Sequence, residues 1–123
     1  MRVVIMDTTE ADGRQLAAPI EELLPTADVL LFTDSADALR AVTQHRPDIV
    51  MTGHDGDRLD GPAFLDAVRD LDGVDPKLVG VVDEPDASMS ARYVDAGATM
   101  VVSRPLDRTD VRLVLRHRAG GVP

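Results

Sequence analysis

The sequence predicts a doubly wound α/β domain, in which a parallel sheet of five strands is covered by helices on both faces. Five short apolar runs alternate along the chain with segments whose apolar residues have helical spacing. The runs are almost continuously apolar, which is typical of parallel strands buried on both faces. A length of 123 residues suits a single domain that folds without disulfides or metals.

Each predicted strand is followed by a helical segment and is bounded by polar or turn-forming residues. The chain has few aromatic residues, namely Phe32, Phe64 and Tyr93, so its core is expected to be aliphatic. The predicted strands are Val3–Met6, Val29–Phe32, Ile49–Thr52, Leu78–Val82 and Met100–Val102.

The first two helices are predicted from apolar residues that recur on one helical face. The first covers Glu10–Leu24 and contains Pro19, which removes a backbone hydrogen bond and clashes with the preceding turn. We expect a kink at this proline, or a helix that restarts there. The second helix covers about Ser35–His45 and ends at the pair Arg46-Pro47.

The third and fourth helices carry clear boundary signals. The third begins at Gly61-Pro62, because proline is well placed in a first helical turn. The fourth covers about Asp86–Asp95, and Gly97 is expected to be its C-terminal cap. Met89 and Tyr93 on the fourth helix are expected to fill the core.

The fifth helix covers about Arg108–Arg118 and is opened by Asp107 or Thr109 as its N-cap. Residues 119–123 have the composition of a frayed tail or of the start of a linker. We therefore expect the domain to cover residues 1–118.

Composition and charge exclude several classes of function. The net charge of −9 opposes binding to nucleic acid, because phosphates would be repelled. The chain has no cysteine, which excludes disulfides and thiolate chemistry. No apolar run is long enough to cross a membrane, and the start MRVVIMD does not resemble a signal peptide. We expect a cytoplasmic protein that contacts neither nucleic acid nor membrane.

The residues that follow each strand are the candidates for chemistry, because ligands of a doubly wound sheet bind beyond the carboxyl ends of its strands. Three segments carry such residues: VVIMDTTE, RPDIVMTGHDGDRLDG and DAGATMVVSRPLD. Their order and spacing resemble the receiver domain of two-component response regulators, from about Arg2 to Arg118. The resemblance implies a flavodoxin-like (βα)5 fold and a role in signal transduction.

The resemblance also implies roles for single positions, and the acidic centre of the family is incomplete here. In the family, the first strand ends in two acidic residues that hold Mg²⁺, and the third ends in the aspartate that accepts a phosphoryl group. Asp7 matches the first acid, but Thr8 stands at the second. Gly53 stands at the acceptor position, where a residue without a side chain cannot form an acyl phosphate.

The positions that relay phosphorylation in the family are altered as well. Val82 replaces a serine or threonine and has no hydroxyl for a phosphoryl oxygen. Val101 replaces an aromatic switch residue, and Arg104-Pro105 replaces Lys-Pro. The fixed charge of Arg104 is expected to pair with Asp7. These differences indicate a degenerate receiver, or pseudo-receiver, that is not phosphorylated at the usual position.

Two alternatives remain for the altered site. His54 or Asp55, which directly follow Gly53, would be a displaced phosphoryl acceptor, and any Mg²⁺ would then bind weakly at Asp7 and Asp55. In the second alternative, the pocket that lost its phosphorylation residues binds a small molecule. The sequence contains no catalytic, phosphate-binding or dinucleotide-binding motif, so neither an enzyme activity nor a cofactor is expected.

The last helix carries a basic stripe on an otherwise acidic chain. Arg108, Arg112 and Arg116 recur at every fourth position, which places them on one helical face. The stripe either compensates charges locally or forms a docking face. The expected partner is a protein: a histidine kinase, an effector domain or a second copy of this chain. Output would then depend on binding rather than on phosphoryl chemistry.

Overall fold

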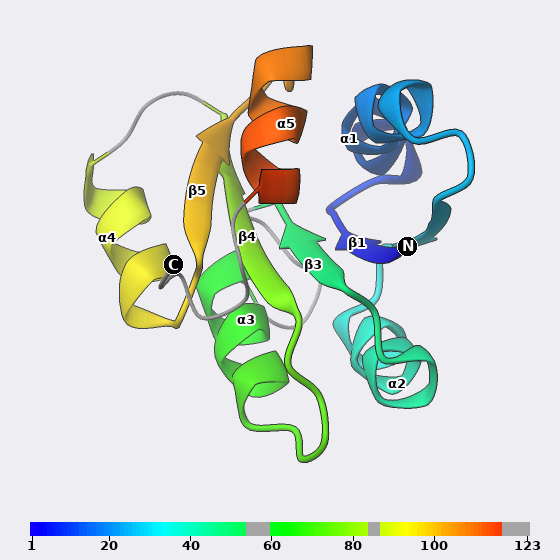
Figure 1. Ribbon diagram of the computed structural model, residues 1–123. Helices are drawn as coiled ribbons and strands as arrows, with labels where there is room; N and C mark the ends of the chain where they lie inside the picture. The colour runs from blue at the N-terminus through cyan, green and yellow to red at the C-terminus, as the bar shows by residue number, and fades with distance from the viewer. Residues whose placement is uncertain (54–59, 84–86, 117–123) are drawn as a thin grey trace.

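A computed structural model describes residues 1–53, 60–83 and 87–116 of the chain (Figure 1). Strands and helices alternate from one end of this part to the other. None of the described helices is long and apolar enough to span a membrane. The elements are β1 (Arg2–Met6), α1 (Glu10–Leu23), β2 (Asp28–Phe32), α2 (Ser35–His45), β3 (Ile49–Thr52), α3 (Gly61–Arg69), β4 (Lys77–Val82), α4 (Ala87–Asp95), β5 (Met100–Ser103) and α5 (Arg108–Arg116).

The five strands form one parallel sheet in the order β2-β1-β3-β4-β5. β1 therefore lies between β2 and β3, and the chain reverses its direction of winding there. This arrangement confirms the predicted doubly wound (βα)5 fold. Because all strands are parallel, their carboxyl ends lie at one edge of the sheet, where the candidate residues were expected.

Helices cover both faces of the sheet and create two cores. The alternation of side chains along β1 shows the division: Val3 and Ile5 pack with α1 and α5, whereas Val4 and Met6 pack with α2, α3 and α4. All four of these side chains are fully buried. Figure 1 shows α1 and α5 on one side of the sheet and α2, α3 and α4 on the other.

The expectation that α1 restarts at Pro19 is wrong, because α1 is a single helix from Glu10 to Leu23 with Pro19 inside it. The missing N–H of Pro19 leaves the carbonyl of Gln15 without its helical donor. Gln15 lies on the exposed face of α1, where water can hydrogen-bond to that carbonyl. The helix also buries Leu16 and Ile20 on either side of the proline, and this packing holds both halves against the sheet.

Side-chain caps define where the helices begin. The two carboxylates of Asp107 and Asp110 each accept a hydrogen bond from the other residue's backbone N–H, at 2.8 and 3.0 Å, so Asp107 rather than Thr109 caps α5. At the end of α4, Gly97 has φ +100°, as expected of a C-terminal cap. The other side-chain caps are Thr9 for α1, Asp34 for α2 and Asp60 for α3.

Tyr93 is the largest fully buried side chain, and two glycines make room for it. Its ring lies over Gly80 of β4, where a Cβ atom would come within 2.5 Å of ring atom Cδ1. A Cβ atom at Gly61, the first residue of α3, would come within 2.8 Å of ring atom Cζ. The hydroxyl donates toward the carbonyl oxygens of Thr52, at 3.3 Å, and Val81, at 3.4 Å. Tyr93 therefore ties α4 to the ends of β3 and β4.

Gly80→Ala is expected to lower the free energy of unfolding by about 1–3 kcal/mol, because the added methyl group overpacks the core at the ring of Tyr93. Urea denaturation measures the change. Gly13→Ala is the control, since a Cβ atom there would meet Leu31 at an ordinary 3.5 Å and alanine favours a helix interior. Equal stability of the two variants would contradict the packing argument.

Candidate functional site

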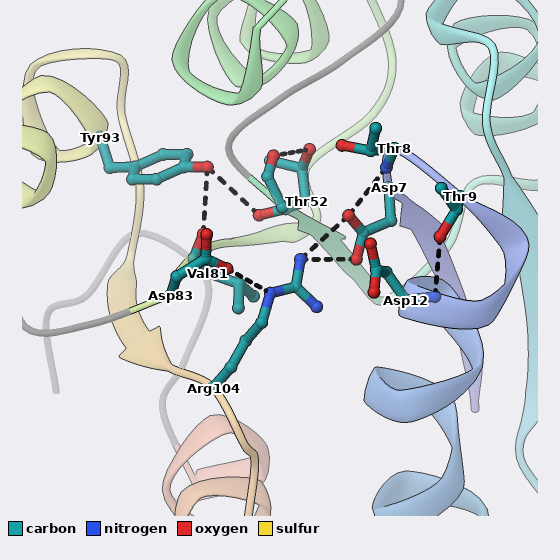
Figure 2. Close-up of polar contacts among 10 residues, drawn as sticks. Asp7, Thr8, Thr9, Asp12, Thr52, Val81, Asp83, Tyr93 and Arg104 are labelled. Atoms are coloured by element: carbon teal, nitrogen blue, oxygen red, sulfur yellow. Dashed lines mark hydrogen bonds and ion pairs between the residues drawn. The ribbon is translucent and has the colours of Figure 1, made fainter.

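Four strand ends bring a small set of functional residues together at one edge of the sheet (Figure 2). Asp7 follows β1, Gly53 follows β3, Asp83 follows β4 and Arg104 follows β5. The backbone N–H of Gly53 donates to the carbonyl of Met6 at 3.1 Å, which extends the sheet to these positions. The site is therefore held by the sheet itself rather than by loops.

An ion pair between Arg104 and Asp7 forms the centre of this site. One guanidinium nitrogen, Nη2, donates to both carboxylate oxygens of Asp7, at 2.7 and 2.9 Å. The backbone N–H of Thr8 donates to the same carboxylate at 2.8 Å. The side chain of Asp7 is only 2% exposed and that of Arg104 only 17%. This contact confirms the predicted pairing and gives a buried carboxylate its counter-charge.

Two further carboxylates surround the Arg104 guanidinium. Nε of Arg104 donates to Asp83 at 2.9 Å, and Asp12 of α1 adds a favourable charge (Figure 2). Burial lowers the pKa of Arg104, but the hydrogen bond to Asp7 and the charges of Asp7, Asp83 and Asp12 outweigh it, so the pKa is raised. The third nitrogen, Nη1, is buried and has no hydrogen-bond partner among the described residues.

Gly53 leaves the space that the guanidinium occupies. A Cβ atom at Gly53 would lie 2.5 Å from Nη2 of Arg104 and 2.9 Å from Cγ of Asp7. Both distances are shorter than any normal contact, so a side chain at position 53 requires the ion pair to move. The absence of a side chain at Gly53 and the presence of the Arg104–Asp7 pair are therefore two parts of one arrangement.

The remaining predicted site residues do not join the ion pair. Thr8 is exposed, and its backbone N–H donates to the Asp7 carboxylate. Val82 is 4% exposed and belongs to the core beneath α3 and α4. Val101 is partly buried against that same core. The structure therefore places Val82 and Val101 in packing positions, and the candidate acceptors His54 and Asp55 lie outside the described residues.

The described residues do not fit a Mg²⁺ ion at this site. Both carboxylate oxygens of Asp7 already accept hydrogen bonds from Arg104, and one of them accepts a further hydrogen bond from Thr8. Among the described residues, no three histidine, aspartate or glutamate side chains are grouped so as to hold a metal. Arg104 would have to release the Asp7 carboxylate before a divalent cation could bind to it.

Comparison with known proteins finds similarity at the level of structure alone, since no family model and no curated protein matches the chain. The chain is similar to the chemotaxis response regulator CheY4 of Vibrio cholerae, with a TM-score of 0.77, 16% identity and coverage of 94% of this chain and 95% of that one. The chain has the fold of a response-regulator receiver domain.

Two further structures share this receiver fold. The first is a receiver domain protein from Clostridium thermocellum, with a TM-score of 0.75, 19% identity and coverage of 93% of this chain and 90% of the other. The second is a response regulator from Burkholderia pseudomallei that has a phosphorylated aspartic acid, with a TM-score of 0.79, 15% identity and coverage of 94% and 66%. At these identities the shared property is the fold.

Sequence reasoning missed the contributions of Asp83 and Asp12 to the charge around Arg104. Asp83 directly follows β4, so its place at the same sheet edge was a usable signal. Asp12 lies in the first turn of α1, and nothing in the sequence shows that this turn lies near the Arg104 guanidinium. The contact between Gly80 and Tyr93 was missed for a similar reason, because the two residues belong to different elements.

The basic stripe on α5 is only partly free. Arg108 pairs with Glu22 of α1, which neutralises the first arginine of the stripe. Arg112 and Arg116 are exposed, and no ion pair is found for them within the described ranges. Leu113, next to Arg112, is 43% exposed. The outward face of α5 therefore combines two cations with an exposed apolar side chain.

Arg104→Met is expected to lower the free energy of unfolding by about 3 kcal/mol, because it leaves the Asp7 carboxylate buried without a counter-charge. Adding Asp7→Asn to the same chain removes that charge and recovers part of the loss. Denaturant unfolding of both single variants and the double variant measures the coupling energy. Asp83→Asn is the control: its carboxylate is 69% exposed, so a loss below about 1 kcal/mol is expected.

Proposed function

We propose that this chain is a phosphorylation-independent pseudo-receiver, a signalling module of response-regulator type that acts through protein binding. The observation that carries the proposal is the position of Arg104. Its Nη2 atom lies 2.5 Å from the place where an acceptor residue at position 53 would have its Cβ atom. The similar response regulator from Burkholderia pseudomallei has a phosphorylated aspartic acid, whereas Gly53 has no group that could bond to phosphorus.

The charge balance of the site supports the same proposal. In a phosphorylation switch, the charge at the site changes when a phosphoryl group is attached to the acceptor carboxylate beside a divalent cation and is later removed. Here the Asp7 carboxylate is matched permanently by Arg104, whose charge does not depend on a bound ion. Val82 and Val101, which pack in the core, offer no hydroxyl that responds to a phosphoryl group. The site therefore stays in one charge state.

The alternative function, binding of a small molecule in the same pocket, has less support than protein binding. The volume beside Gly53 is filled by the side chains of Arg104 and Asp7, both of which are largely buried. A ligand would have to displace an ion pair whose carboxylate is only 2% exposed. No observation in the described part of the chain favours this alternative over protein binding.

Wild-type protein is expected to keep its mass after incubation with Mg²⁺ and acetyl phosphate, because position 53 has no carboxylate to accept the phosphoryl group. Intact-mass spectrometry checks this directly. An adduct of one phosphoryl group would overturn the proposal. Peptide mapping of that adduct to His54 or Asp55 would then establish the displaced acceptor.

Designed variants separate the loss of the acceptor from the presence of Arg104. Gly53→Asp alone is expected to remain largely unmodified, because the guanidinium competes for the space and charge of the new carboxylate. Adding Thr8→Asp and Arg104→Lys supplies a second acidic residue and a compact cation on a flexible stem. This triple variant is the one expected to gain the adduct. Equal modification of the single and triple variants would contradict the role given to Arg104.

The exposed face of α5 is the proposed binding surface, and a second copy of the chain is the simplest partner to test. If the chain self-associates through it, Arg112→Glu with Arg116→Glu is expected to raise the dissociation constant roughly tenfold, as sedimentation velocity would show. Arg40→Glu on α2 is the control, since that exposed arginine pairs locally with Asp37. Wild-type protein that remains monomeric at all concentrations contradicts the homodimer and leaves a different protein as the partner.

A further inference from the structure

We propose that the free edge of β2 is a docking site for an extended segment of another protein, with apolar residues at alternate positions and a basic residue at each end. The segment would add a sixth strand to the sheet. This proposal concerns a surface other than α5 and goes beyond the proposed function.

Among the described residues, only one side of the β2 backbone is paired with another strand. β2 lies at the edge of the sheet, with β1 as its neighbour. The N–H of Asp28 and the carbonyl of Phe32 are bonded to residues at the two ends of β1, at 2.9 and 3.0 Å. In a parallel ladder the residues that pair alternate with residues that point away. The N–H and carbonyl groups of Val29 and Leu31 are therefore directed outward, in register for a further strand.

A groove runs beside this edge and gives side chains of an added strand a place to lie. The groove has a volume of about 400 Å³ and is bounded by β2 and the first turns of α1. Val29 and Leu31 point toward α1 and are half-buried. The buried Gly13 presents no side chain there. The lining residues are Thr9, Glu10, Gly13 and Arg14 from α1, and Val29, Leu30, Leu31, Phe32 and Thr33 from β2 and the residue after it.

The edge lacks the usual protection against strand addition. Natural edge strands carry lysine, proline, a bulge or an inward-pointing charge that blocks a further strand. β2 reads DVLLF, with its one charge at the first position. It pairs with β1 over all five residues without a bulge. An unprotected apolar edge on a folded domain marks a surface that another chain covers.

The charges at the two ends of β2 indicate whether the added strand comes from a second copy of this chain or from another protein. Two copies of β2 could pair as antiparallel strands through the outward N–H and carbonyl groups of Val29 and Leu31. The two strands overlap along their whole length when Leu31 of one copy lies opposite Leu31 of the other. This register places Asp28 opposite Asp34 at both ends, and like charges on opposed residues are destabilising. Each copy also has a net charge of −9. The second copy is therefore the disfavoured occupant.

A partner with basic residues at both ends matches the same features. Asp28 is 57% exposed, and its 3.2 Å contact with the exposed Arg2 is a weak surface pair. Asp34 lies two residues beyond the other end of β2. The charges of Glu10 and Arg14 in the groove cancel. The net charge beside β2 is therefore negative, because of Asp28 and Asp34. The complementary segment is apolar in its middle and carries Lys or Arg at its ends.

A tethered strand tests the proposal on the full chain. The probe Lys-Val-Thr-Val-Thr-Val-Lys is fused ahead of Met1 through a Gly/Ser linker, which supplies an effective concentration on the order of millimolar. Amide hydrogen exchange, followed by NMR, is the measurement. In the unfused protein the amides of Val29 and Leu31 are expected to exchange quickly, and that of Leu30 is expected to be protected. With the probe, Val29 and Leu31 are expected to become protected as well.

Charge variants show whether the edge selects its partner. A probe with Glu at both ends is expected to give roughly threefold to tenfold less protection at Val29 and Leu31. Asp28→Lys leaves one charge of each sign at the two ends of the edge, so it is expected to remove most of the difference between the two probes. Asp66→Lys on α3, which also removes an exposed aspartate paired with an arginine, is the matched control and leaves the preference unchanged.

Three results would overturn the proposal. No added protection of Val29 and Leu31 with the Lys probe means that the edge does not accept a strand. Equal protection by both probes means that the edge accepts any strand and does not select a basic partner. Protection that rises with the concentration of the unfused protein means that the occupant is a second copy of this chain.

Discussion

The ion pair between Arg104 and Asp7 is the interaction on which the rest of the site depends. Asp7 is buried at the end of a central strand, where an unpaired carboxylate would be strongly destabilising. Its counter-charge comes from the end of β5, two strands beyond β3 in the sheet. The guanidinium must therefore cross the end of β3, and it does so over Gly53. Arg104 thereby joins β1, β4 and β5 in one fixed arrangement.

The same exchange of volume occurs twice in this sheet. A glycine in a central strand, or directly after one, has no side chain, and a large polar side chain from a distant segment fills the space beside it. Gly53 makes room for Arg104, and Gly80 makes room for Tyr93. Both large side chains also contact the end of a strand, Arg104 at Asp7 and Tyr93 at the carbonyl of Thr52.

The sequence predicted the fold well, because continuous apolar runs and helical spacing are local patterns. The strand positions and the caps at Asp107 and Gly97 follow from neighbouring residues and are confirmed. The Arg104–Asp7 pair was predictable, since opposite charges stood at two strand ends that the fold brings to one edge. Of the two outcomes expected at Pro19, the restart of the helix was wrong, because the local cost of a proline was weighed without the packing of Leu16 and Ile20 on either side.

By itself, the sequence determined an α/β domain with the order of a receiver fold, a residue without a side chain at position 53 and a fixed cation at position 104. Only the tertiary structure decided what that cation does. Whether Arg104 extends into solvent or crosses Gly53 to a buried carboxylate depends on distances between strands that are far apart in the chain. Steric fit and burial are properties of the folded interior, and a linear order of residues does not contain them.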